Sequence, residues 1–128
     1  MVWLILENKL CMKINVDTSR QLVQIALGDS LFEKLVKQVE KDFILANNPL
    51  KITKTINGVS FIALIREKVY YLMMEHFAEY LNLMYIIDIP EKEFEHIQIT
   101  DTVDVADQIT FLILKREYKK VWYRNRYQ

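Results

Sequence analysis

The sequence predicts a mainly α-helical domain, a compact bundle of four or five helices around one long central helix. Residues 60–87 form the longest stretch with helical periodicity, and they contain neither glycine nor proline. The whole chain of 128 residues has only two glycines and two prolines, whereas an all-β protein needs many such residues at its turns. Apolar residues make up 52% of the chain. We therefore expect residues 1–128 to form a single domain with one sizeable core.

The central stretch is apolar around most of its circumference. On a helical wheel its charged residues share one narrow strip, which is typical of a helix contacted from several sides. Arg66 and His76 fall within the apolar arc, so we expect both to be buried and to meet a carboxylate or carbonyl oxygen. A ligand pocket or a catalytic base at His76 is the functional alternative. Glu75 and Glu79 near the middle argue against a membrane span.

The N-terminal part allows two interpretations. Residues 1–11 begin with an apolar run but lack a basic segment and are too short for a signal peptide; they are either a first structural element or an extension with a non-native start. Alternating apolar residues predict a short strand at 12–16. Asp17 or Thr18 is then expected to cap a helix that ends near Gly28.

A second helix is expected from about Leu31. Ser30 and Glu33 have the spacing of a capping box, in which each side chain binds a backbone N–H at the helix start. This helix is expected to end before Pro49, because proline disfavours the α conformation in the residue that precedes it.

Residues 51–57 are the place where a strand competes with a loop. β-Branched residues alternate there, and Asn57-Gly58 is the strongest short-range signal for a hairpin turn, so a small β element is one interpretation. The other is a loop that leads into Ser60 as the N-cap of the central helix. We favour the loop, because the second arm of a hairpin would use the residues that start the helix.

Two neighbouring segments carry opposite charges. Residues 88–107 contain seven acidic residues against Lys92 alone, with Pro90 and its acids predicting a short helix start. Residues 115–128 contain six bases against Glu117 alone. The bases are Lys115, Arg116, Lys119, Lys120, Arg124 and Arg126. Two or three bases would be enough to complement the helix dipole, so the remaining bases are expected to contact a partner.

The last helix, expected from about Val103 to Tyr123, has two apolar stripes on opposite sides. The aromatic stripe consists of Phe111, Leu114, Tyr118, Val121 and Trp122. A helix that packs on one side needs one stripe, so the second indicates either burial between neighbouring helices or an exposed interface for another chain. Residues 124–128 are expected to be either its last turn or a frayed end.

No catalytic motif is found. Cys11 is the single cysteine, no serine lies in a nucleophile elbow, and two glycines cannot build a phosphate-binding loop. Glu93 and His96 have the spacing of half a di-iron site, but the second Glu-x-x-His is missing. We therefore expect no catalytic residue, no cofactor and no metal, and the lone cysteine favours a reducing, cytoplasmic setting.

These observations predict a non-enzymatic protein–protein interaction or assembly module that self-associates through its C-terminal helix, with no membrane partner. The alternative is a nucleic-acid-binding accessory protein, in which the six bases contact phosphates and nearby aromatic residues stack on unpaired bases. The zero net charge and the adjacent acidic segment favour the first interpretation.

Overall fold

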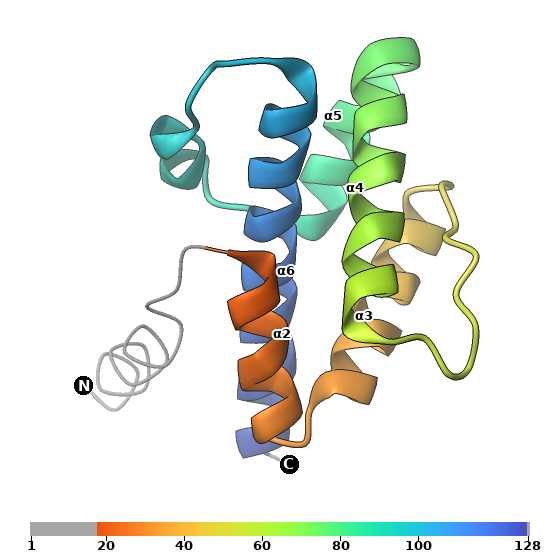
Figure 1. The fold of residues 1–128 in the computed structure, drawn as a ribbon, viewed down its shortest axis with the longest axis vertical. Helices are drawn as coiled ribbons and strands as arrows, with labels where there is room; N and C mark the ends of the chain where they lie inside the picture. The colour runs from red at the N-terminus through yellow and green to blue at the C-terminus, as the bar shows by residue number, and fades with distance from the viewer. Residues whose placement is uncertain (1–17, 128) are drawn as a thin grey trace.

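The computed structural model describes residues 18–127, in which five α-helices and one 3-10 helix form a bundle (Figure 1). The elements are α2 (Ser19–Gly28), α3 (Phe32–Leu45), α4 (Gly58–Glu75), α5 (Phe77–Ile87), η1 (Glu91–His96) and α6 (Thr102–Arg126). The mainly α fold class is confirmed. The predictions for residues 1–11 and for a strand at 12–16 lie outside the described residues.

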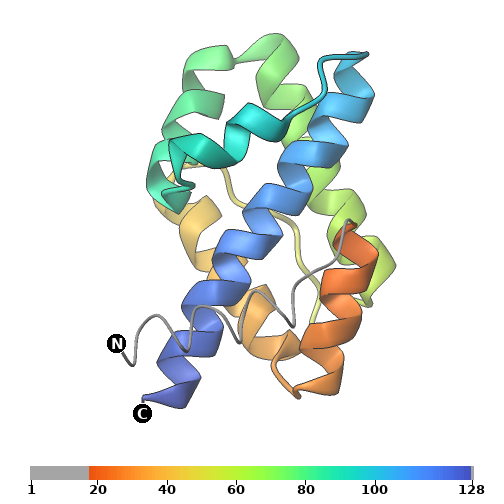
Figure 2. The ribbon, with the colours of Figure 1, turned by 90° about the vertical axis from the view of Figure 1, so that its left-hand side faces the viewer.

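The 60–87 stretch contacts every other described α-helix, with α4 against α2 and α6 and α5 against α3 and α6. Helix α6 does the same as a single helix: it contacts α2, α3, α4 and α5, and in Figure 2 it runs diagonally across the face turned to the viewer. Asp101 caps its start by accepting the backbone N–H of Asp104 at 2.8 Å. The helix continues to Arg126, three residues beyond the expected end at Tyr123.

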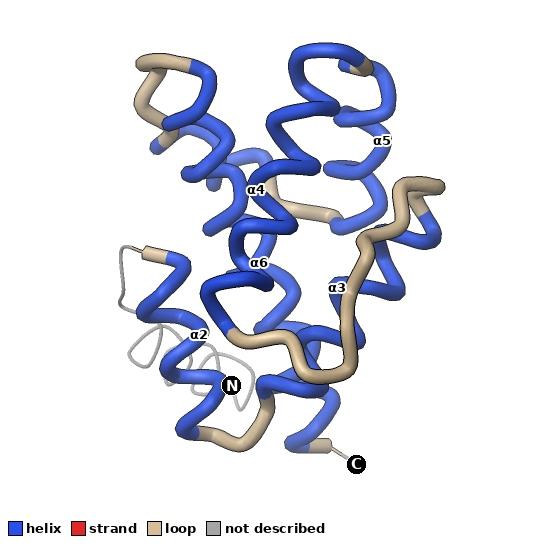
Figure 3. Tube along the Cα trace, turned by 45° about the vertical axis from the view of Figure 1, so that its right-hand side comes forward, coloured by secondary structure: helices blue, strands red, loops and turns tan. Residues whose placement is uncertain are grey.

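The prediction of one continuous helix over residues 60–87 is wrong, because the chain turns at His76. The backbone of His76 is non-helical, with φ −146° and ψ 65°, and α5 folds back against α4 (Figure 3). The turn lets α5 bury Tyr80, Leu83 and Ile87.

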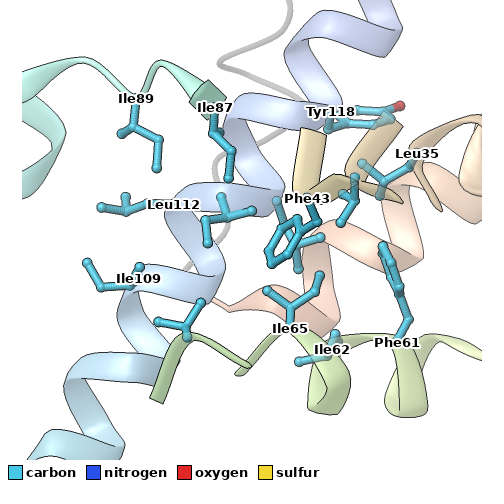
Figure 4. Close-up of a cluster of buried hydrophobic side chains, with 14 of the residues drawn as sticks. Leu35, Phe43, Phe61, Ile62, Ile65, Ile87, Ile89, Ile109, Leu112 and Tyr118 are labelled. Carbon is cyan, nitrogen blue, oxygen red and sulfur yellow. The ribbon is translucent and has the colours of Figure 1, made fainter. Parts of the chain in front are cut away.

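The core fills the space between α6 and the surrounding helices. Figure 4 shows side chains from α3, α4, α5 and α6 converging there. Among them are Leu35, Phe43, Phe61, Ile65, Ile87, Ile109, Leu112 and Tyr118. Burial of these large apolar groups is the main favourable contribution to the folded state.

The helix ends agree with the sequence prediction at both ends of α2 and differ from it at the start of α3. Thr18 forms a capping box with Gln21, and α2 ends at Gly28 as predicted. The expected capping box of Ser30 and Glu33 is wrong: Ser30 has a φ of 58°, and Leu31 occupies the N-cap without a side-chain bond. A left-handed residue at 30 makes a tight connection between α2 and α3, which moves its hydroxyl away from the helix start.

Residues 51–57 form a loop, so the small β element is wrong there; no strand occurs in the described range 18–127. The N-cap of α4 is Asn57, whose side-chain oxygen accepts the Ser60 N–H at 2.9 Å, and not Ser60 itself. A Cβ on Gly58 would lie 2.7 Å from Val23 Cγ1. Asn57-Gly58 therefore starts a helix that approaches α2 closely.

Replacing Asn57 with alanine is expected to lower the free energy of unfolding by about 1 kcal/mol, because the N–H groups at the start of α4 lose their side-chain acceptor. Urea denaturation followed by circular dichroism measures the change. Thr55→Ala is the control, since Thr55 is exposed in the same loop. Equal stability of both variants would contradict the capping role.

Candidate functional site

The aromatic stripe of α6 lies inside the bundle. Leu114, Tyr118, Val121 and Trp122 are buried, and Phe111 is partly buried against the core. Of the two predicted alternatives, the structure therefore has burial between neighbouring helices. Because α6 is surrounded by four helices, both of its stripes pack within the chain, and these side chains are not an exposed interface.

The basic residues of α6 are mostly engaged within the chain. Lys115 Nζ lies 3.3 Å from Glu93 Oε2 on η1, and Arg116 Nη2 lies 3.4 Å from Asp88 Oδ2 at the end of α5. The guanidinium of Arg126 lies 5.6 Å from the ring centroid of Trp122. The opposite charges of the two segments thus complement each other within one chain. Lys119 is half-buried, and Arg124 is exposed.

The sixth base, Lys120, points inward and joins two carboxyl groups between α3 and α6. Its Nζ donates to Asp42 Oδ2 at 2.8 Å and lies 2.8 Å from Glu117 Oε1. Gln38 Nε2 also donates to Asp42 Oδ2, at 3.2 Å. Lys120 and Glu117 thus form an ion pair, although neither buried oxygen of Glu117 has a hydrogen bond of good geometry within the described residues.

Burial and charge set opposite protonation states for the two carboxyl groups. Burial, the largest cause, and the neighbouring carboxyl of Asp42 both raise the pKa of Glu117, Lys120 opposes the rise, and the resulting pKa is about 8. For Asp42, burial tends to raise the pKa, but contacts with Glu117, Lys120 and Gln38 outweigh it and lower the pKa. A protonated Glu117 beside an ionised Asp42 leaves Lys120 balanced by one negative charge.

Arg66 and His76 have the partners that were expected but are not buried. Arg66 is 39% exposed, with its Nη1 3.7 Å from Asp107 Oδ1. His76 is 47% exposed, because the turn between α4 and α5 places it at the surface. Its Nδ1 lies 3.2 Å from Glu79 Oε2, and its Nε2 lies 3.0 Å from Tyr71 Oη. These contacts hold the turn together and do not form a pocket.

The α4–α5 hairpin carries large apolar side chains that the core does not use. We call these side chains the hairpin face. It consists of Tyr70, Tyr71 and Met74 on α4 and Phe77, Leu81 and Tyr85 on α5. The members on α5 follow an i, i+4, i+8 row and are 56%, 53% and 80% exposed. Contiguous apolar surface of more than a few hundred Å² is often functional in monomers, so these exposed side chains make the hairpin a candidate interface.

The described residues contain neither a cluster of metal ligands nor a membrane-spanning helix. Within residues 18–127 no group of three or more His, Cys, Asp or Glu side chains could hold a metal ion, and Glu93 instead pairs with Lys115. None of the described helices is long and apolar enough to cross a membrane. Cys11 lies outside the described residues.

No family model, curated protein or solved structure matches this chain.

Proposed function

We propose that this chain is a non-enzymatic assembly module that self-associates through the hairpin face rather than through the aromatic stripe of its C-terminal helix. The observation that carries this proposal is the exposed row of Phe77, Leu81 and Tyr85 on α5. The nucleic-acid alternative receives less support. Three of its six bases are in ion pairs within the chain, and Arg126 lies over Trp122.

The area of the hairpin face fits a protein interface. Large aromatic side chains bury about 150–250 Å² each, so six side chains that are roughly half exposed present on the order of 600 Å² of apolar surface. Each partner in a stable complex of standard size contributes about 800 Å². The hairpin face together with the polar residues around it therefore has about the area that one partner contributes to such an interface.

A second copy of the chain is the occupant that we propose. A row with i, i+4 spacing is a ridge, and two such ridges pack into each other's grooves at about −50°. In a two-fold arrangement Leu81, at the middle of the row, lies at the axis, and Phe77 of each copy meets Tyr85 of the other. This pairing is self-complementary and closes after two copies.

Replacing Leu81 with aspartate is expected to weaken the dimer at least tenfold, because the pairing would bury two unpaired carboxylates near the axis. Sedimentation equilibrium over a concentration series measures the association. Ile99→Asp is the matched control, since Ile99 is also exposed but lies in the loop before α6. Circular dichroism checks that both variants keep the helical fold.

A cysteine at position 81 tests the axis directly. In a Cys11→Ser background, Leu81→Cys is expected to form an intermolecular disulfide under mild oxidation, because two-fold symmetry brings the two copies of this residue together. Ile99→Cys should crosslink far more slowly. A wild-type chain that stays monomeric at high concentration, or a dimer unchanged by Leu81→Asp, would contradict the proposal.

A further inference from the structure

A groove with four basic side chains lies between α3 and the C-terminal part of α6. Its volume is about 350 Å³. The basic residues that line it are Lys34, Lys37, Lys41 and Arg124, and no acidic residue is among the described residues of its wall. This volume lies within the range of small-molecule sites, about 300–1,000 Å³.

None of the four basic side chains of this groove forms an ion pair within residues 18–127. Lys34 Nζ donates to Asn125 Oδ1 at 2.7 Å, which is a neutral acceptor. Lys37, Lys41 and Arg124 make no ion pair or hydrogen bond within residues 18–127. Asp42 on the same helix is buried and held by Lys120, and Glu33 and Glu40 line a neighbouring hollow rather than this groove. The described wall of the groove is therefore positively charged and has no carboxylate of its own.

The helix dipole does not explain these bases. Lys34 lies in the first turn of α3, where a positive side chain is unfavourable because the N-terminal end of the dipole is itself positive. Arg124, in the last turn of α6, does complement its own helix. The three lysines of α3 at i, i+3 and i+7 line the same groove as Arg124 of α6, and the dipole of α3 does not favour the first of them.

We propose that this groove binds a compact polyphosphate anion, that is, a short chain of linked phosphate groups. Lys34 and Lys41 are seven residues apart, or about 10 Å along the helix, so a single phosphate would not reach both ends. Lysine ammonium groups bind phosphate oxygens as point charges. No aromatic residue is among the described residues that line the groove, so the groove offers no ring on which a nucleobase could stack.

Inorganic tripolyphosphate is the probe that tests this site. Calorimetric titration of the full chain at low salt is expected to show one binding site, with an affinity that falls as salt rises. The double substitution Lys37→Gln and Lys41→Gln should weaken binding at least tenfold. The control, Lys51→Gln with Lys92→Gln, removes two exposed charges outside the groove and should leave the affinity within twofold of wild type.

Competing ligands distinguish the sources of the phosphate chain. Adenosine triphosphate should bind as well as tripolyphosphate if the phosphates alone are recognised. An oligonucleotide that binds at least tenfold tighter than tripolyphosphate would overturn the proposal in favour of nucleic acid. Absence of tripolyphosphate binding at low salt, or equal loss in both double variants, would also overturn it. Leu81→Asp should not affect this binding, so the two proposals fail independently.

Discussion

Replacing Tyr118 with alanine is expected to lower the free energy of unfolding by about 3–5 kcal/mol, because truncating a fully buried aromatic residue leaves a cavity at the centre of α6. Tyr118→Phe keeps the ring and removes only the hydroxyl, so it measures the contribution of the hydroxyl to stability separately. The hydroxyl donates to Asp29 Oδ2 at the C-cap of α2, and its loss is expected to cost about 1 kcal/mol. Urea denaturation at neutral pH measures both changes.

Tyr127→Ala is the control for this prediction, since Tyr127 is exposed just after the same helix. Its effect on stability should stay within about 0.5 kcal/mol of wild type. If Tyr118→Ala kept wild-type stability and changed only the oligomeric state in solution, the aromatic stripe would be an interface and not part of the core.

The sequence predicted the helical class and most helix ends, because those depend on local chemistry. The end of α2 at Gly28 and the end of α3 before Pro49 were both expected from single residues that disfavour helix. The turn at His76 has no such local signal, since neither glycine nor proline is near it. It depends on where the apolar residues of α5 find a core, which is a tertiary effect.

The same turn explains why the hairpin face was missed. A wheel drawn through residues 60–87 superimposes two helices whose buried sides differ, so apolar residues appear on every side. On a wheel drawn for α5 alone, the row of Phe77, Leu81 and Tyr85 lies apart from the buried Leu83 and Ile87. An i, i+4, i+8 row beside a second apolar row is the signal that would have found it.

The basic groove could not be predicted, because its two walls are far apart in the sequence. The lysines of α3 are typical of the solvated face of a surface helix, and Arg124 belongs to the charged C-terminal segment. Only the packing of α3 against α6 brings them together. The inward direction of Lys120 has the same origin, since its carboxylate partner Asp42 lies on α3.

Glu117 is expected to make the stability of this fold depend on pH near neutrality. Its pKa is about 8 in the folded chain and about 4.5 when solvated. Between these values the folded state binds one proton more than the unfolded state, so the free energy of unfolding falls as pH rises. The slope approaches about 1.4 kcal/mol per pH unit. The lowered pKa of Asp42 acts only at acidic pH, where its stabilising contribution is lost as pH falls.

Replacing Glu117 with glutamine is expected to remove this slope, because the amide keeps the shape of the protonated acid and can donate to Asp42 without titrating. The variant should match wild type near pH 5 and exceed its stability by a few kcal/mol near pH 8. Urea denaturation at half-unit pH steps, plotted as the difference between variant and wild type, isolates Glu117 from the two histidines.

Glu95→Gln is the matched control for Glu117→Gln, because it makes the same chemical change at an exposed position on η1. Its difference from wild type should stay flat from pH 5 to 8. A flat difference for Glu117→Gln as well would mean that Glu117 is ionised in the folded chain at neutral pH. Lys120 would then be shared between two buried carboxylates, and the cluster would carry a net negative charge.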